Sequence, residues 1–63
     1  MELIRKLDET AAGLRELADQ VRRAAPEVGD MELRGEMLES ADGLERRAEE
    51  MTEAIARLRV KIN

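Results

Sequence analysis

Cysteine, histidine and aromatic residues are all absent from this chain of 63 residues. Without cysteine there is neither a disulfide nor a thiolate ligand, and without histidine a common zinc ligand and the usual general base at neutral pH are missing. Without Phe, Tyr or Trp there is no ring on which a nucleic-acid base stacks and no aromatic anchor for a binding interface. We therefore expect no cofactor, no metal site and no enzymatic activity.

Positive charge and long apolar runs are also scarce. The chain carries 11 basic and 15 acidic residues, a net charge of -4, so it lacks the overall positive charge typical of nucleic-acid binders. No apolar run approaches the ~20 residues that span a bilayer, and the segment 1–9 carries acids where a signal peptide would be apolar. These features favour a soluble, cytoplasmic protein without membrane contact.

Two groups of polar side chains are candidates for a catalytic or metal-binding site. The hydroxyls have no histidine to activate them: Thr10, Ser40 and Thr52. Three acids follow one another at intervals of four, as metal ligands in helical bundles do: Glu45, Glu49 and Glu53. They fall outside the predicted apolar seam, and arginines of the same helix lie within reach, such as Arg46 for Glu49 and Arg57 for Glu53. This favours a solvated face with intrahelical ion pairs.

One segment, 26–30, reads as a break between two helices. Pro26 disfavours helical geometry at Ala25, and Asp30 is a good N-cap for a helix that begins behind it. Both flanks are rich in Ala, Leu, Glu, Arg and Met, the strong helix formers. We predict a helix over 2–25, a turn over 26–30 and a helix over 31–61, which form one all-α hairpin over 1–63. The alternative is a second break at Asp42-Gly43, but the apolar period continues through it.

Apolar residues recur with a heptad spacing in both helices, with Ile4 at an a position. In the first helix the stripe is Ile4, Leu7, Ala11, Leu14, Ala18, Val21 and Ala25, widened at g by Leu3, Leu17 and Ala24. In the second it is Met37, Ala41, Leu44, Ala48, Met51, Ile55, Leu58 and Ile62. A short turn makes the helices antiparallel, and stripes this wide are typical of bundles rather than two-stranded zippers.

Folding the chain about 27–28 predicts which residues face each other. The layers would pair Ala18 with Met37, Leu14 with Ala41, Ala11 with Leu44, Leu7 with Ala48, and Ile4 with Met51. Alanine then faces a large side chain in four of the five layers, which permits close packing. The apolar residues of 55–62 extend past the first helix in this register, uncovered by their own chain.

A two-helix hairpin with such stripes cannot enclose its own core, and exposed apolar stripes mark association sites. We therefore expect a homodimer that forms a four-helix bundle, since two-fold dimers are the commonest oligomers. The expected interface residues are Ile4, Leu7, Leu14, Leu17, Leu44, Met51, Ile55 and Leu58. The alternatives are a higher oligomer or a hetero-partner whose helices cover Ile55–Ile62.

The two halves of the chain resemble each other at an offset of 30 residues. Nine of the thirty aligned pairs are identical, including Met1-Glu2-Leu3 with Met31-Glu32-Leu33 and Gly13 with Gly43. Duplication of a one-helix unit and coincidence in a restricted helical alphabet both explain this pattern. An internal repeat is also what a designed miniprotein would show, whereas nine arginines to two lysines suit a natural, GC-rich origin.

The last helical turns carry three cations without an acid: Arg57, Arg59 and Lys61. Cations at a helix C-terminus are stabilised by the helix dipole. The functional alternative is a nucleic-acid contact at this end, as in a small regulator or a nuclease accessory subunit, although the lack of aromatics makes nucleic acid the less favoured partner.

The hairpin and its alternating layers resemble, in architecture, the Rop-type homodimeric four-helix bundle. That family binds paired RNA loops through a polar face that includes an aromatic, which is missing here, so this function is not implied. Gly29-Asp30, Leu33, Gly43 and Arg59-Val60 are similar to the pattern of the exodeoxyribonuclease VII small subunit. The register slips by one residue between Gly43 and Arg59, and the aromatic expected after the turn is absent.

Overall fold

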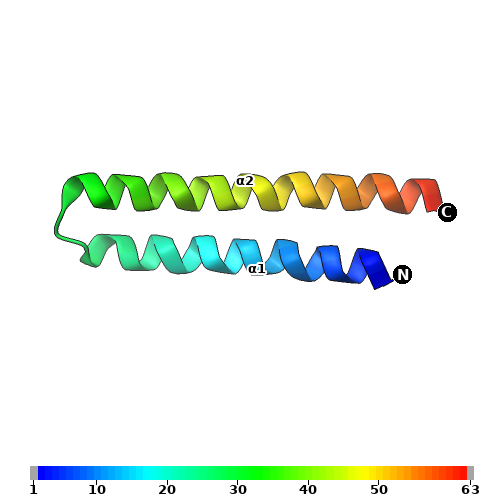
Figure 1. Ribbon diagram of the computed structural model, residues 1–63, viewed down its shortest axis with the longest axis horizontal. Coiled ribbons are helices and arrows are strands. Elements are labelled where there is room, and N and C mark those ends of the chain that lie inside the picture. Colours follow the sequence, from blue (N-terminus) through cyan, green and yellow to red (C-terminus); the bar gives the residue numbers. More distant parts are fainter. Residues whose placement is uncertain (1, 63) are drawn as a thin grey trace.

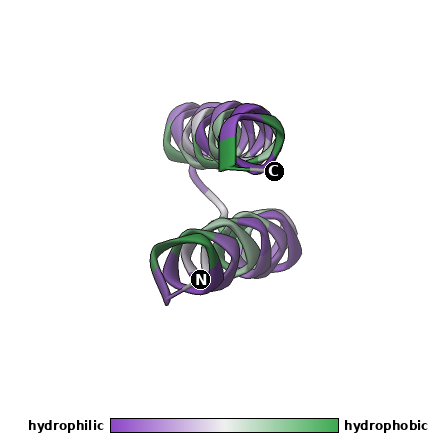
Figure 2. Cartoon of the chain, turned by 90° about the vertical axis from the view of Figure 1, so that its right-hand side faces the viewer, coloured by the Kyte–Doolittle hydropathy of each residue, from purple (hydrophilic) through white to green (hydrophobic). Residues whose placement is uncertain are grey.

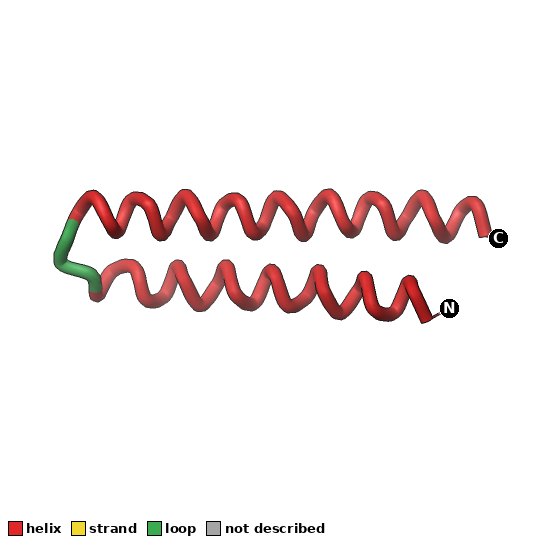
Figure 3. Tube along the Cα trace, viewed as in Figure 1, coloured by secondary structure: helices red, strands yellow, loops and turns green. Residues whose placement is uncertain are grey.

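The computed structural model describes residues 2–62, and they form a hairpin of two long helices lying side by side (Figure 1). Helix α1 covers Glu2–Ala24, a short 3-10 helix η1 covers Ala25–Glu27, and α2 covers Met31–Ile62. Only a short loop joins them at one end (Figure 3). The predicted all-α hairpin is confirmed.

Pro26 and Asp30 act at the turn as predicted, but the predicted turn over 26–30 begins with a 3-10 helix and its loop is confined to 28–30. α1 ends at Ala24, and Pro26 lies in the first turn of η1, where its missing N–H costs nothing. Asp30 caps α2: its Oδ1 accepts hydrogen bonds from the backbone N–H groups of Glu32 and Leu33, at 2.9 and 3.1 Å. Arg34 then donates to the Val28 carbonyl through Nε and Nη2, which ties the loop to α2.

Helix α2 continues through Asp42-Gly43 without interruption, so the alternative break is wrong. No glycine among residues 2–62 has a positive φ, and a Cβ built on Gly13, Gly35 or Gly43 would meet nothing within 4 Å. These glycines are therefore not required by the backbone of the hairpin itself.

Six residues are buried, and they all occupy the heptad position a. They are Ala11, Ala18, Ala25, Ala41, Ala48 and Ile55, each at most 2% exposed. They form three pairs 30 residues apart, so both halves of the chain contribute equivalent positions to the seam. The core of the hairpin is thus a row of alanine methyl groups ending in one isoleucine.

The predicted register between the helices is wrong by one heptad. Arg15 of α1 contacts Thr52 of α2, and Arg59 contacts Asp8. The predicted register would place Arg15 level with Ser40, about 18 Å from Thr52 at 1.5 Å of rise per residue, which exceeds the reach of an arginine.

A shift of seven residues satisfies these contacts and keeps every a position opposite a d position. The layers become Ala25 with Met37, Val21 with Ala41, Ala18 with Leu44, Leu14 with Ala48, Ala11 with Met51, Leu7 with Ile55, and Ile4 with Leu58. The chain stays helical through Glu27, so the loop lies at 28–30 and the fold centre moves toward the C-terminus. Because a positions must stay opposite d positions, the register then changes by a whole heptad.

The expectation that Ile55 and Leu58 extend uncovered past α1 is therefore also wrong. Ile55 is 2% exposed and Leu58 is half-buried. Val60 and Ile62 remain exposed, at 78% and 53%. The stretch Ile55–Ile62 thus offers a hetero-partner only its last residues.

Seen along its length, the hairpin is one pair of helices, so each helix has a single neighbour (Figure 2). The Cα atoms extend over 50 × 14 × 10 Å. A layer of two helices has no further helix covering either of its broad flanks. The side chains on these two flanks differ in chemistry.

Candidate association surface

One flank of the seam is closed by polar contacts between the helices. They join heptad positions e and b: Arg15 with Thr52, Arg22 with Asp42 and Glu45, and Arg59 with Asp8. Positions e lie next to position a on a helix, and in an antiparallel pair the e positions of the two helices face each other. We call this side the ion-paired flank.

Arg22 is the centre of the ion-paired flank. Its guanidinium donates to Asp42 Oδ1 at 2.8 Å and to a carboxylate oxygen of Glu45. These hydrogen bonds, first that to Asp42 and then that to Glu45, raise the pKa of Arg22 above its usual value. The arginine is therefore charged at neutral and mildly alkaline pH, and its ion pairs link α1 to α2.

The opposite flank consists of positions d and g and is apolar. Its d positions are large side chains that the hairpin only half buries: Leu7, Leu14, Val21, Met37, Leu44, Met51 and Leu58. Its g positions add Leu3, Leu17 and Leu33, which are 50%, 47% and 47% exposed. We call this side the open apolar face.

The remaining g positions of the open apolar face are mostly small and uncharged: Thr10, Ala24, Ser40 and Ala54. Only Arg47 and Lys61 bring charge to it, and both belong to α2. Among residues 2–62, every polar side-chain contact between the two helices lies on the other flank. The hairpin is therefore closed on one side and apolar on the other.

The open apolar face has a groove at its middle, lined by Ser40, Gly43, Leu44 and Arg47. Gly43 contributes no side chain to this groove, and a Cβ at that position would meet nothing within 4 Å. A glycine at the neighbouring c position thus lowers the surface of α2 beside the g row.

The predicted interface residues fall into two sets. Leu7, Leu14, Leu17, Leu44, Met51 and Leu58 lie on the open apolar face. Ile4 and Ile55 occupy a positions within the seam, where Ile55 is fully covered by its own chain. Leu3 and Leu33 also lie on the open apolar face. The sequence indicates that both widen the apolar stripes, but they are not among the predicted interface residues.

The three cations near the end of α2, Arg57, Arg59 and Lys61, are partly neutralised by acids of the same chain. Arg57 lies 3.7 Å from Glu53 one turn earlier, and Arg59 forms its ion pair with Asp8 of α1 at 3.0 Å. Lys61 makes no ion pair with any residue of 2–62. Two of the three cations singled out for nucleic acid therefore have carboxylate partners within the chain.

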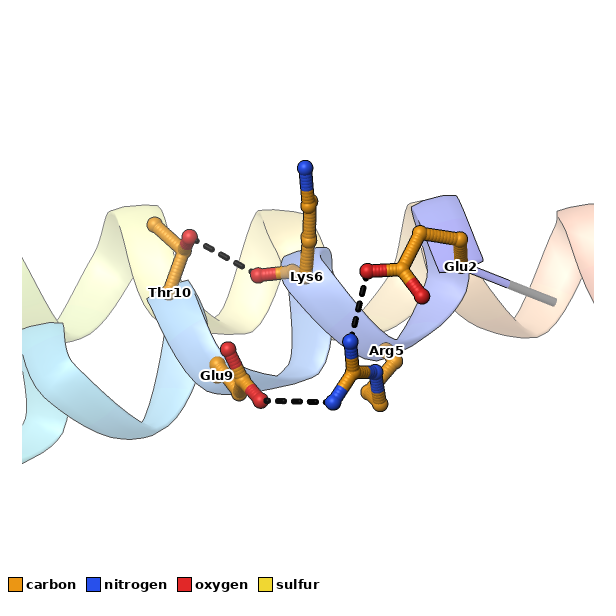
Figure 4. A network of polar contacts seen from close by, with 5 residues as sticks. All are labelled: Glu2, Arg5, Lys6, Glu9 and Thr10. Carbon is orange, nitrogen blue, oxygen red and sulfur yellow. Dashed lines mark hydrogen bonds and ion pairs between the residues drawn. The ribbon is translucent and has the colours of Figure 1, made fainter.

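The remaining polar groups are occupied with the helices themselves. Near the N-terminus, Arg5 bridges Glu2 and Glu9, and the Thr10 hydroxyl donates to the Lys6 carbonyl at 2.9 Å (Figure 4). The Thr52 hydroxyl similarly donates to Ala48. Exposed pairs of this kind contribute a few tenths of a kcal/mol each, about 0.3–0.5 within a helix.

Within residues 2–62 no three acidic side chains gather closely enough to hold a metal ion. Over the same residues, neither helix combines the length and apolarity needed to cross a lipid bilayer. No family model matches the chain, and comparison with curated proteins and with solved structures gave no significant match.

Proposed function

We propose that this chain is a non-catalytic protein–protein association module, a scaffold or adaptor whose hairpins pair as a homodimeric four-helix bundle through the open apolar face. The main support for this proposal is the difference in burial between the a positions of the heptad and its d and g positions. The alanines and Ile55 at a positions are buried inside the hairpin, whereas the large d side chains remain half-buried and the g leucines about half exposed. In a four-helix bundle such side chains form the core between hairpins.

The small core of the hairpin supports the same proposal. Five of its six buried residues are alanines, and each buried methyl contributes about 0.8 kcal/mol. Ordering one residue costs about 1–2 kcal/mol of conformational entropy. A second layer of helices would bury the leucines and methionines that one hairpin leaves in water.

The size of the open apolar face also suits a second copy. The Cα atoms of the broad side span 50 by 14 Å, a projected area of about 700 Å², which is of the same order as the roughly 800 Å² of accessible surface that each partner of a stable interface buries. A partner of the same length covers it from end to end.

The experiment compares two leucines of similar exposure on opposite flanks. Leu17 is 47% exposed on the open apolar face, and Leu38 is 41% exposed at an e position of the ion-paired flank. We expect Leu17→Glu to give monomers in sedimentation equilibrium at concentrations where the wild type and Leu38→Glu are dimeric, because a buried carboxylate is costly. Equal behaviour of the two variants would refute association through the open apolar face.

A further inference from the structure

The orientation of the two hairpins follows from where charge lies on the open apolar face. We infer that the partner is a second copy of this chain packed with its loop at the same end, so that α1 of each copy lies on α2 of the other. This inference rests on the proposed homodimer and specifies how its two copies are arranged.

Two-fold symmetry allows two ways to stack one broad face on another. With the two-fold axis parallel to the helices, both loops lie at one end and α1 of one copy covers α2 of the other. With the axis perpendicular to them, the loops lie at opposite ends, and each helix covers its own counterpart in reverse direction. Neighbouring helices are antiparallel in both arrangements, so helix dipoles do not choose between them.

Charge does choose. The midpoint of α2, Met31–Ile62, lies beside Arg47. Full overlap with loops at opposite ends therefore stacks Arg47 on the partner's Arg47, and Leu33 on the partner's Lys61. A like-charge pair on the symmetry axis of an apolar interface is strongly unfavourable.

Stacking α1 on α2 avoids this repulsion. The g positions of α1 carry no charge: they are Leu3, Thr10, Leu17 and Ala24. Arg47 then packs its aliphatic stem on uncharged side chains of the partner's α1, and its guanidinium reaches the rim in water.

The groove at Gly43 fits the same arrangement. In the observed register Leu17 lies level with residue 45 of its own α2. An axis parallel to the helices preserves this height, so Leu17 of one copy arrives over the groove lined by Ser40, Gly43, Leu44 and Arg47 of the other. Because Gly43 has no side chain, a leucine can approach the helix closely there. With loops at opposite ends, Leu17 meets α1 of the other copy and the groove receives no leucine from it.

The test uses the absence of cysteine, which makes every introduced thiol unique. We would attach a nitroxide spin label at Gly29→Cys in the loop, or at Val60→Cys, 78% exposed at the other end. Distances between the labels in the full-length dimer are then measured by pulsed dipolar EPR. Gly29 accepts a side chain without a clash, since nothing lies within 4 Å of its Cβ.

With both loops at one end, each label pair is separated by the width of a four-helix bundle. Helix axes 8–10 Å apart give about 20–30 Å between nitroxides, for either variant. With loops at opposite ends, the same label pairs lie near the 50 Å length of the hairpin.

The outcomes separate the two proposals. Short distances for both variants support the inferred orientation. Distances near 50 Å would overturn the orientation and leave the homodimer standing. A dipolar signal that is absent at concentrations where the unlabelled protein is fully helical would overturn the homodimer and the orientation together.

Discussion

The register of the hairpin makes a sharp prediction about two isoleucines. Ile55 is 2% exposed and is the one large side chain among residues 2–62 that is fully buried. Ile62, seven residues later at the same heptad position, is 53% exposed beyond the start of α1. Substituting each by alanine removes the same atoms from the same position of the heptad, so the pair isolates burial from chemistry.

The expected magnitudes follow from that difference. Replacing a buried isoleucine by alanine costs about 2–5 kcal/mol, from lost transfer free energy and from the cavity left behind. Ile55 lies in the next-to-last layer, where neighbours can partly collapse, so we expect about 2–3 kcal/mol per chain for Ile55→Ala. For Ile62→Ala we expect less than about 1 kcal/mol, since half of its surface is already in water.

The assay is urea unfolding followed by circular dichroism at 222 nm, at one fixed protein concentration for all variants. The midpoint should fall strongly for Ile55→Ala and slightly for Ile62→Ala, with similar slopes. Equal losses would refute the register, because both residues would lie beyond the first helix if the chain folded about 27–28.

Three further substitutions test local features. Gly35→Ala should raise the free energy of unfolding by about 0.5–1 kcal/mol, because Gly35 is exposed inside α2 and its Cβ would meet nothing; thermal melts check this. Asp30→Ala should lower it by about 1 kcal/mol in urea unfolding, because two backbone N–H groups lose their acceptor. Arg22→Met should lower stability slightly and more at low salt. Because the pKa of Arg22 is raised, the stability that its ion pairs contribute is fully present below the usual pKa of arginine and is lost only as the pH rises through the raised pKa. Urea unfolding should therefore show the same loss of stability for Arg22→Met at neutral and at mildly alkaline pH.

The fold could be predicted because its signals are local. Pro26 and Asp30 act on their own backbone through ring geometry and a capping carboxylate, and both mark the ends of helices in the structure. The heptad likewise predicts which faces of the helices meet. Alanine at each a position of α1 after Ile4 indicates the close packing that the burial of Ala11 and Ala18 shows.

The register could not be predicted, because a heptad pattern repeats itself. A shift of seven residues exchanges one set of a–d layers for another, and alanine still faces a large side chain in most of them. The short 3-10 turn at Ala25–Glu27, which contains Pro26, moves the loop along the chain, and only the contacts of Arg15 and Arg59 identify which of the possible registers forms. The contacts of Arg15 and Arg22 depend on this register and so were also inaccessible.

The open apolar face was partly predictable. Leu17 was recognised at a g position, but the sequence treats positions a and d as one seam. The structure divides them: Ala18 at a is 1% exposed, whereas Leu14 at d is only half-buried. The small side chains at a bring the helices together along that line and turn the d side chains outward toward the open apolar face.

Pairing of two hairpins through the open apolar face is tested most directly by measuring solution mass by light scattering across a concentration series. Helicity is measured by circular dichroism on the same samples. If the hairpin folds by pairing with a second copy, we expect a helical species near twice 7.1 kDa that loses mass and helicity together on dilution. A monomer that stays fully helical at every concentration would contradict it, because the hairpin would then be stable with its open apolar face in water.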